Sequence, residues 1–338
     1  MARITILGGG RQGSVVAREL AADHEVTVID SVARSIPDVQ NRQSDLGSRD
    51  AVRAALEGCD MAVGALPARF GFAAAQAAID AHKNYVDLAF SEEDAYSLHD
   101  AAQAAGVAVL PDCGLAPGIS NLVIGRALAT AKRQSVRVEV GGVAADKSKP
   151  YGYVVTWAVS DLQDEYVRPA RIVREGKVIE LPPFAELEHI EIPGVGTLES
   201  FLTDGCRTLL SIDVPSVEEK TLRWPGHAAA IQPLVAQGTF VEEISSKCTQ
   251  GDDLVVLRIT IDDQVILLID RPQAGLSAMS RTTALTCASF AAWVATGKLK
   301  ETGVLAPETI GRDSQAYEFI LNRLAAHGVK LQPDRPFA

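Results

Sequence analysis

The chain has 338 residues, a formal net charge of −11 and a hydrophobic fraction of 47%, which is typical of a globular protein long enough for two domains. It shows no lysine–arginine cluster, no leader pattern and no apolar run long enough to span a membrane, so we discount nucleic acid and membranes as partners and expect a cytoplasmic protein. The five cysteines form no C-x-x-C pair and the six histidines show no metal-binding spacing, so we predict neither a disulfide framework nor a metal.

The N-terminal segment follows the order strand, glycine-rich turn, helix and strand. An apolar strand over residues 3–7 leads into Gly8, Gly10 and Gly13, which fit the pattern G-x-G-x-x-G, and Asp30 ends the next strand. In such a turn the first glycine permits the tight bend, the second lets a pyrophosphate approach the backbone, and the third packs the helix on the strand. The spacing predicts a dinucleotide-binding unit; the alternative is a glycine turn that binds nothing.

Asp30 and its neighbours favour NAD over NADP. The carboxylate would accept hydrogen bonds from the ribose hydroxyls of NAD and would repel the 2′-phosphate of NADP. Ser31 follows it rather than an arginine, although Arg34, one turn further along, could still reach a 2′-phosphate. We therefore predict NAD, with NADP as the less favoured cofactor. Further dinucleotide contacts are expected at Arg11, Gln12, Asp45, Ala65, Leu66, Pro67, Arg69 and Pro117.

Helices and strands continue to alternate up to residue 118. Helices are expected over residues 49–58, 72–81 and 92–105, and strands over residues 60–66, 84–88 and 106–110. Short apolar strands separated by helices of this length imply parallel β-α-β units buried on both faces. We therefore predict an α/β fold in which a Rossmann-type doubly wound parallel sheet spans residues 1–118 and is joined again by about residues 297–338.

The pattern changes after Gly118. Helices are expected over residues 120–131, 278–296 and 315–326, and strands over residues 136–143, 153–159, 171–173, 178–181, 254–261 and 265–270, the last two pairs as hairpins. We therefore predict that residues 119–296 form an inserted α+β domain with a largely antiparallel sheet, and that this domain binds the substrate. One face of this sheet is expected to be free for dimerisation, so we predict a homo-oligomer, either a dimer or a tetramer.

Polar side chains follow the strands of the first domain, at the edge where ligands bind. Arg69 follows Pro67, and Asp87 lies near the end of the next strand, where it could act as a base, anchor a substrate amine or simply cap a loop. The stretch over residues 110–121 contains Asp112, two prolines and two glycines, and Ser120 or Asn121 is a natural N-cap. The helix that follows would direct its positive end at the cofactor or at an anionic group of the substrate.

Several motifs resemble the saccharopine dehydrogenase-like family of NAD(P) oxidoreductases. The first group is the glycine turn with Asp30, ALPARF at residues 65–70, YVDL at 85–88 and DCGLAPGISN at 112–121. Residues 165–173, 203–209, 220–227 and 279–283 resemble the lysine 6-dehydrogenase branch more than the saccharopine reductase branch. The reductase branch has an aspartate where Ala116 stands here. The resemblance covers nearly the whole chain and implies the oxidation of a carbon–nitrogen bond in an amino acid, with lysine as the leading substrate.

The implied chemistry needs a proton acceptor and a carboxylate clamp. A hydride leaves the carbon only when the amine is neutral, so a base must take the ammonium proton, and an arginine holds the substrate carboxylate. Arg223 and His227 share a loop that Pro225 stiffens, and they are the leading catalytic candidates. The further proton acceptors considered are Asp87, Asp112, Asp161 and Asp164.

The remaining substrate contacts are expected from Arg281, which could hold a carboxylate, and from Tyr151, Tyr153 and Trp157, which could line the pocket. Each has an alternative reading, because Tyr153 and Trp157 could belong to a sheet core and His227 could be a buried, hydrogen-bonded histidine. Two rival functions stay open. One is a saccharopine-type enzyme that joins or cleaves a secondary amine, and the other is an NAD(H)-binding sensor or partner protein without turnover.

Overall fold

The computed structural model describes residues 1–337, and the chain forms two compact units. Unit 1 contains Met1–Gly125 and Thr283–Gly328, and unit 2 contains Arg126–Thr282 and the segment that begins at Val329. The chain changes unit inside two helices, α5 (Ile119–Thr130) and α9 (Ala278–Ala295), rather than after residues 118 and 296. The predicted boundaries followed the change in strand pattern. A boundary that falls inside a continuous helix leaves no such signal in the sequence, so the boundaries within α5 and α9 were not predicted.

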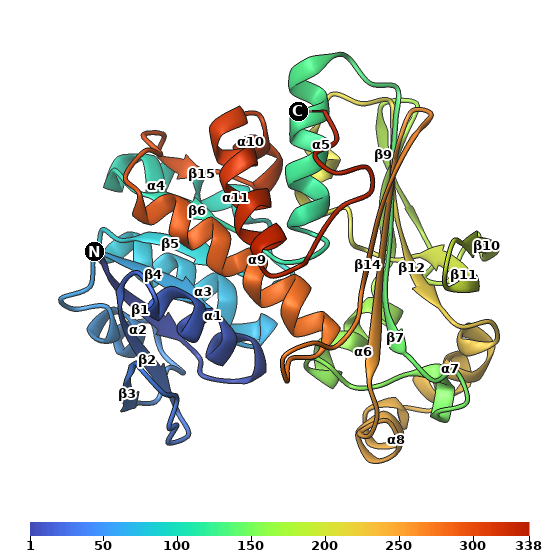
Figure 1. The fold of residues 1–338 in the computed structure, drawn as a ribbon, viewed down its shortest axis with the longest axis horizontal. Coiled ribbons are helices and arrows are strands. Elements are labelled where there is room, and N and C mark those ends of the chain that lie inside the picture. Colours follow the sequence, from blue (N-terminus) through green and yellow to red (C-terminus); the bar gives the residue numbers. More distant parts are fainter. Residues whose placement is uncertain (338) are drawn as a thin grey trace. The chain divides into compact units, whose positions relative to one another are not determined.

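Unit 1 is built on a seven-stranded sheet in which every pairing is parallel (Figure 1). In spatial order its strands are β15 (Gly303–Val304), β6 (Ala108–Leu110), β5 (Asn84–Asp87), β4 (Met61–Gly64), β1 (Arg3–Leu7), β2 (Glu25–Asp30) and β3 (Gln40–Gln43). The expected doubly wound parallel sheet is therefore present. The sequence did not predict β3, because its four residues are polar and exposed, or β15, which is only two residues long.

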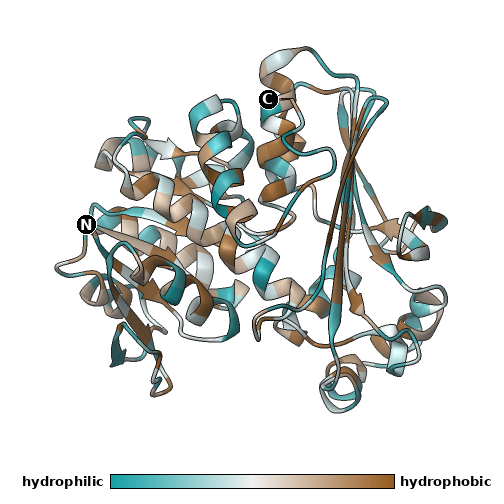
Figure 2. Ribbon diagram, viewed as in Figure 1, coloured by the Kyte–Doolittle hydropathy of each residue, from teal (hydrophilic) through white to brown (hydrophobic). Residues whose placement is uncertain are grey.

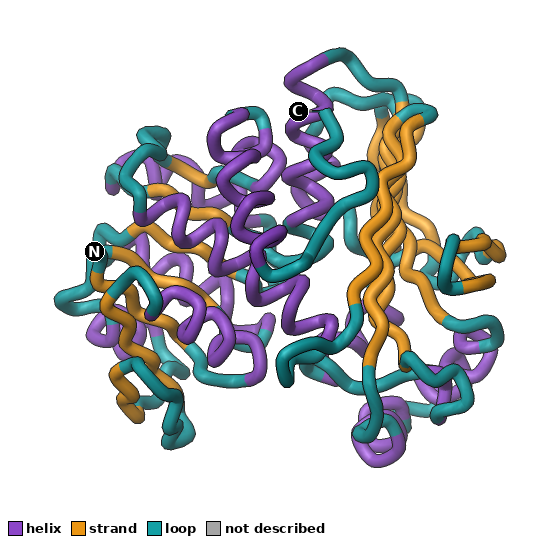
Figure 3. Tube along the Cα trace, in the orientation of Figure 1, coloured by secondary structure: helices purple, strands orange, loops and turns teal. Residues whose placement is uncertain are grey.

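Helices of unit 1 alternate with these strands (Figure 3). Besides α5 and α9 they are α1 (Arg11–Ala21), α2 (Arg49–Ala55), α3 (Ala68–Asp80), the 3₁₀ turn η1 (Ala95–Leu98), α4 (His99–Ala105), α10 (Pro307–Gly311) and α11 (Ser314–Ala326). Local sequence explains several of their ends. Ser48 accepts a hydrogen bond from the Ala51 N–H at the start of α2, and Gly106 ends α4 in the left-handed conformation that glycine favours.

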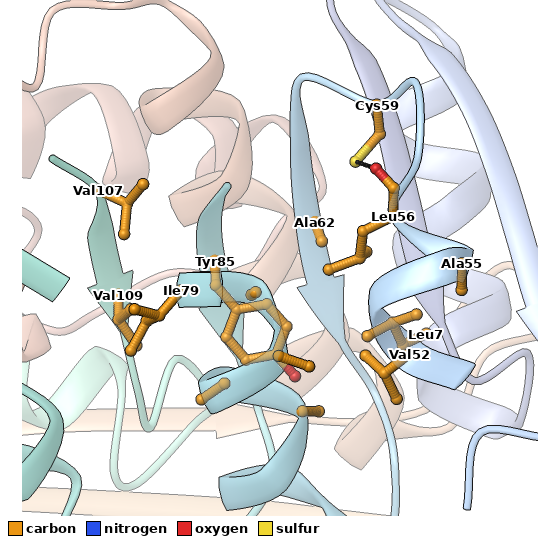
Figure 4. Packing of buried hydrophobic residues seen from close by; sticks show 14 of the residues in the cluster. Leu7, Val52, Ala55, Leu56, Cys59, Ala62, Ile79, Tyr85, Val107 and Val109 are labelled. Atoms are coloured by element: carbon orange, nitrogen blue, oxygen red, sulfur yellow. Dashed lines mark hydrogen bonds between the residues drawn. The ribbon is translucent and has the colours of Figure 1, made fainter. Parts of the chain in front are cut away.

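The core of unit 1 lies between the sheet and helices α2, α3 and α4. Figure 4 shows Leu7, Ala62 and Tyr85 of the sheet facing Val52 of α2 and Ile79 of α3, and all five are buried. Across neighbouring strands, Leu7, Ala62 and Tyr85 occupy positions that are in register or offset by two residues. Their side chains therefore lie on the same face of the sheet, the face that the helices cover. The packing fixes the strand ends, and with them the turns that follow each strand.

Unit 2 is built on an eight-stranded mixed sheet. In spatial order the main path is β10 (Glu188–Ile192), β11 (Gly196–Leu202), β12 (Ser216–Arg223), β7 (Ser135–Ala144), β13 (Asp253–Ile261) and β14 (Gln264–Asp270), and β8 (Ala170–Arg174) pairs with both β12 and β9 (Lys177–Leu181). Only the β12–β7 pairing is parallel, so the sheet is largely antiparallel as expected. The predicted hairpins β8–β9 and β13–β14 are both confirmed.

The predicted strand over residues 153–159 is wrong. Residues 153–158 belong to no strand, and α6 (Val159–Val167) begins at the end of the range. Leu162 and Tyr166 are the buried residues of α6 and stand four apart, which is the spacing of one helix face. The remaining helices of unit 2 are α7 (His227–Ala236) and α8 (Phe240–Lys247), with 3₁₀ turns η2 (Pro150–Gly152) and η3 (Arg207–Ser211).

The C-terminal segment, expected to return to the first domain, joins unit 2 from Val329 onward. There Gln332 and Leu267 exchange two backbone hydrogen bonds of 2.8 and 2.9 Å along the edge of β14. Hydrophobic residues are frequent on the central strands of both sheets, whereas the edge strands β3 and β10 are largely hydrophilic (Figure 2). None of the helices within residues 1–337 combines the length and the hydrophobicity that crossing a bilayer requires.

Candidate functional site

The glycine turn after β1 has the geometry that a dinucleotide needs. Gly8 has a φ of +98°, and a Cβ atom placed on it would lie 2.5 Å from the carbonyl oxygen of Ala65. A Cβ on Gly13 would lie 2.0 Å from the carbonyl oxygen of Gly8, so this glycine lets α1 pack on the strand. A Cβ on Gly10 would meet nothing within 4 Å. The first and third glycines are therefore needed for packing, and the second faces open space where a pyrophosphate can approach.

Gln12 supplies a second observation at this turn. Both polar atoms of its side-chain amide are buried, and neither has a hydrogen-bond partner within the described residues. Buried polar groups are nearly always paired, so an unpaired amide beside the first turn of α1 points to a bound group. The N–H groups and the positive dipole end of this helix also favour an anion. The residues present fit a dinucleotide.

Asp30 lies at the end of β2 with its carboxylate buried beside this turn. Its Oδ2 accepts hydrogen bonds from the Gly9 N–H (2.7 Å) and pairs with Arg34 Nε (3.1 Å), and its Oδ1 accepts from the Val32 N–H (2.8 Å). Burial raises the pKa of Asp30, but the N–H groups of Val32 and Gly9 and the Arg34 guanidinium outweigh it and hold the pKa below its ordinary value. Since a carboxylate has about four acceptor positions, the ionised Asp30 retains room for one further donor at Oδ1.

The other predicted cofactor residues divide into two groups. Ala65 and Leu66 border the glycine turn, with Leu66 Cδ2 3.3 Å from a Cβ placed on Gly8. The other residues contact neighbours near them in the protein. Arg11 is exposed at the start of α1, Pro67 precedes α3 and Arg69 stacks on Phe70. The Ser31 carbonyl accepts a hydrogen bond from Gln43, the Asp45 carboxylate accepts one from the Gly47 N–H, and the Pro117 carbonyl accepts one from the Gly114 N–H. Their roles toward the cofactor stay predictions.

Asp87 and Asp112 are both buried in unit 1. The Asp87 carboxylate accepts from the Ala89 N–H at 2.9 Å, and its backbone carbonyl accepts from the Cys113 N–H at 2.8 Å. Burial raises the pKa of the Cys113 thiol, and the charges of Cys287, Asp112 and Asp87 raise it further. Both carboxylates therefore lie near one thiol, at the ends of β5 and β6.

Arg223, at the end of β12, is the centre of a buried polar cluster in unit 2. Its Nε donates to Tyr166 Oη at 2.8 Å, its Nη1 to the carbonyl of Leu222 at 2.9 Å and its Nη2 to Glu165 Oε1 at 3.2 Å. The guanidinium carbon also lies 5.4 Å from the centre of the Tyr153 ring and 5.6 Å from that of Tyr166. A buried cation between aromatic rings and one carboxylate is held in a fixed orientation.

His227 completes this cluster at the start of α7. Its Nε2 accepts from Tyr166 Oη at 3.0 Å and its Nδ1–H donates to the carbonyl of Tyr151 at 2.7 Å, which is the tautomer that satisfies both partners. Burial, and then the charge of Arg223, lower the pKa of His227 to about 3. The imidazole is therefore neutral, uses both nitrogens and orients Tyr166. This geometry favours the alternative of a hydrogen-bonded buried histidine; a direct catalytic role for His227 stays a prediction.

Two predicted residues are held by partners of their own. Arg281 is buried and forms a two-point ion pair with Asp270, through Nε at 2.7 Å and Nη2 at 3.3 Å. Asp164 is half-exposed and pairs with Arg168 on the next turn at 2.8 Å. Trp157 donates to Tyr153 Oη at 3.1 Å, so these two aromatic residues do lie together, beside Arg223. No group of three or more His, Cys, Asp and Glu side chains within the described residues is arranged to hold a metal.

Tyr166 and Glu165 belong to this cluster, and sequence reasoning did not single them out. Both lie on α6, a helix that the sequence analysis did not predict. The signal was the pair Leu162 and Tyr166, whose spacing of four predicts a helix that buries one face. Glu199 was also missed: its carboxylate accepts from the N–H groups of Gly226 and Ala228 and caps α7, although it lies far away in sequence.

Comparison with known proteins gives matches over both units. Residues 4–110 match the model of the saccharopine dehydrogenase NADP binding domain, and residues 114–329 match that of the saccharopine dehydrogenase C-terminal domain. The fold is similar to that of apo saccharopine dehydrogenase (L-Glu forming) from Saccharomyces cerevisiae, with a TM-score of 0.75 and 18% identity over 98% of this chain and 99% of the other.

Two curated relatives are larger proteins. The chain is 22% identical over 233 residues to alpha-aminoadipic semialdehyde synthase from Arabidopsis thaliana, covering 64% of this chain and 22% of that protein. It is 22% identical over 193 residues to the mitochondrial alpha-aminoadipic semialdehyde synthase from Mus musculus, covering 52% of this chain and 21% of that protein. The chain thus spans about a fifth of the length of these relatives.

Proposed function

Because the chain belongs to the saccharopine dehydrogenase family, whose members are NAD(P)-dependent dehydrogenases acting on amino groups, we propose that it catalyses the NAD-dependent oxidative deamination of a basic amino acid, with lysine as the leading substrate. The observation that carries this proposal is the buried Arg223, held between Tyr153, Tyr166 and Glu165. A buried cation beside a carboxylate suits a small zwitterionic substrate, which brings both an anion and an ammonium group.

The glycine turn, the Gln12 amide and Asp30 would hold the dinucleotide, whose nicotinamide accepts the hydride when it is bound. Asp30 supports NAD over NADP, because its remaining acceptor position suits a ribose hydroxyl and its charge opposes a phosphate. Arg34 gives NADP its best support, since only its Nε is engaged by Asp30 and its side chain is 37% exposed.

Arg223 is the proposed clamp for the substrate carboxylate. Three of the five N–H groups of its guanidinium are used by Tyr166, Leu222 and Glu165, which leaves two for a ligand. Planar guanidinium binds a carboxylate through two parallel hydrogen bonds, and such bonds are strong in a buried site. Tyr166 and His227 hold the guanidinium in place through Nε, so they position the clamp.

The ammonium proton must be removed before the hydride can leave. The proposed proton acceptors are Asp87, Asp112 and Asp164; Glu165, a carboxylate of the cluster with 14% of its side chain exposed, is engaged by Arg223. His227 is the weaker choice as it stands, because its pKa of about 3 makes it a poor base and its Nε2 is already bonded to Tyr166.

A saccharopine-type reaction is the second candidate. It is favoured by the two matched domain models, which are both named for saccharopine dehydrogenase. Such an enzyme would oxidise NADH only when an amino acid and a keto acid are supplied together. Ala116 weighs against it, because it stands where the reductase branch has an aspartate.

The experiment screens the standard amino acids and common diamines for NAD reduction, which is measured as the absorbance of NADH. The expected result is NADH formation with lysine or a close analogue and no keto acid. NADH oxidation that requires a keto acid would select the saccharopine-type reaction. Binding of NADH without turnover in either screen would select a sensor and contradict the proposal.

We also propose a cytoplasmic homo-oligomer that associates through the sheet of unit 2. The supporting observation is that β14 exposes Val265, which is 45% exposed, and half-buries Leu267 and Ile269 on the same face. Light scattering after gel filtration tests this association, and a monomer at micromolar concentration would contradict it.

A further inference from the structure

A buried line of hydroxyl and carboxyl groups joins Glu219 to Glu165, the ionic partner of Arg223. Thr203 Oγ1 lies 2.6 Å from Glu219 Oε2 and 2.9 Å from Thr221 Oγ1. Thr221 Oγ1 in turn donates to Glu165 Oε1. Glu219, Thr203 and Thr221 are 4% exposed or less, so this line has one end inside the unit and the other at Glu165, where 14% of the side chain is exposed.

Counting protons shows that both carboxyl groups cannot be ionised together. The line has three oxygen–oxygen contacts, and each needs a proton between its two oxygens. The two threonine hydroxyls supply only two protons. With both glutamates ionised, the hydroxyls would donate to the carboxylates and the 2.9 Å contact between Thr203 and Thr221 would bring two lone pairs together. One additional proton, on one of the two glutamates, satisfies every contact.

Glu219 is the better resting place for this proton. Within residues 1–337 no lysine or arginine bonds to its carboxyl group, whose Oε2 is contacted by the Gly205 N–H at 3.1 Å and by Thr203 Oγ1 at 2.6 Å. Burial raises the pKa of Glu219 to about 8, with the charges of Glu165 and Asp204 also raising it and the hydrogen bonds of Thr203 and Gly205 lowering it.

Other ionisable groups around the line do not supply a cation to Glu219. Asp204 is held by Arg171 through two contacts of 2.8 and 2.7 Å, so that arginine is engaged. The Cys206 thiol is buried, and burial followed by the charge of Glu219 raises its pKa, so it stays neutral. At the other end Glu165 faces the Arg223 guanidinium and the neutral phenols of Tyr153 and Tyr166.

We propose that Glu219, Thr203, Thr221 and Glu165 form a proton wire that holds one mobile proton, resting on Glu219 and able to move to Glu165. In the transfer the O–H bond of Glu219 breaks, each threonine passes on one proton and accepts another, and an O–H bond forms on Glu165; no electrons change hands. Glu219 is thus a positioning residue that sets the charge beside Arg223.

The use of the wire rests on the proposed function. A substrate carboxylate on Arg223 would place a second negative charge beside Glu165, and like charges favour protonation of one of them. Moving the proton from Glu219 to Glu165 removes this repulsion and releases Arg223 Nη2 for the substrate. When the substrate leaves, the proton returns and Glu165 pairs with Arg223 again.

The test measures the infrared C=O band of protonated carboxyl groups against pH in the full chain, without substrate. In the wild type we expect a band at neutral pH that disappears with a midpoint near 8 and is absent in Glu219→Gln, whose amide can donate to Thr203 and keeps the fold. Glu165→Gln supplies an amide donor at the other end and removes a charge, so it should lower the midpoint by about one unit or more, a tenfold change in proton affinity.

Thr203→Val separates the wire from simple proximity. In the Thr203→Val background, Glu165→Gln should shift the midpoint of the Glu219 band only by the electrostatic effect that acts without the hydrogen-bonded line. In the control background Thr156→Val the shift should keep its full size, because Thr156 is a buried threonine whose hydroxyl bonds to nothing within the described residues. An equal shift with and without Thr203, or no band that depends on Glu219, would overturn the wire. An intact infrared titration without any amino-acid oxidation would contradict the proposed function and leave the wire standing.

Discussion

The polar cluster of unit 2 has a fixed donor direction at the scale of single residues. Arg223 Nε donates to Tyr166, Tyr166 donates to His227 Nε2, and His227 Nδ1 donates to the carbonyl of Tyr151. Tyr151 itself has a φ of 56°, a conformation that costs free energy for a residue other than glycine. The strained residue thus supplies the acceptor that fixes the tautomer of His227, and through it the orientation of Arg223.

His227→Gln should make the protein relatively more stable in acid. Because burial and Arg223 depress the pKa of His227 to about 3, the unfolded chain binds a proton that the folded chain does not, and stability is lost as the pH falls from 6.5 toward 3. The effect is on the order of a few kcal/mol, since one pKa unit corresponds to about 1.4 kcal/mol. Urea unfolding at several pH values measures it, with exposed His189→Gln as the control.

The same acid-dependent loss in wild type and His227→Gln would mean that the imidazole is protonated in the folded state. Turnover gives a second readout for the variant. We expect the KM for the amino acid to rise about tenfold or more with unchanged NADH affinity, because a displaced Tyr166 no longer holds the carboxylate clamp Arg223. A variant with an unchanged KM would remove His227 from the site.

Asp30→Ala should weaken NAD binding and narrow the preference for NAD over NADP. The carboxylate accepts from the Gly9 and Val32 N–H groups and would accept from a ribose hydroxyl, while its charge opposes a phosphate. The expected change in the NAD/NADP ratio is about tenfold, equivalent to about 1.4 kcal/mol, and titration of both dinucleotides measures it. A wild type that prefers NADP tenfold would contradict the assignment, and Arg34→Ala would then be expected to abolish that preference.

At the scale of elements, the sequence pattern predicted those helices and strands whose formation depends on neighbouring residues in the chain. The strands over residues 3–7 and 25–30 and most helices of unit 1 follow from apolar runs and turn residues. The strand β3 and the pairing of β12 could not be predicted, since a polar strand is defined only by the neighbour it bonds to. The side chains that contact Arg281 and Glu219 could not be predicted either, because strand pairing places them there from other segments of the chain.

The helix α7 depends on one such distant partner. Glu199, on β11, accepts from the N–H groups of Gly226 (2.7 Å) and Ala228 (2.6 Å) and is 2% exposed. Glu199→Gln removes the charge and turns a donor toward one of these N–H groups, which should destabilise the protein by about 1–3 kcal/mol. Urea unfolding followed by circular dichroism checks this, with exposed Glu191→Gln as the matched control; equal stability of the two variants would show that α7 needs no cap.

At the scale of the whole molecule, family membership and fold agree over both units, and the proposed chemistry rests on the polar cluster. Two matched domain models cover residues 4–110 and 114–329, and the glycine turn with Asp30 and Gln12 fits a dinucleotide. The side chains of the proposed substrate site come from several segments: β12 brings Arg223, α6 brings Glu165 and Tyr166, and α7 brings His227. Sequence motifs marked Arg223 and His227, and only the structure joined them to α6.

The proposed reaction removes an amino group from an amino acid while reducing NAD. The most direct measurement follows NADH formation and ammonia release together, with lysine and without a keto acid, in wild type and in Arg223→Lys. We predict equal amounts of NADH and ammonia from the wild type, and a KM for the substrate lysine raised at least about tenfold in the variant, because a lysine side chain keeps the charge of Arg223 but loses the planar fork that grips a carboxylate. NADH formation without ammonia, or an unchanged KM in Arg223→Lys, would contradict the proposed reaction.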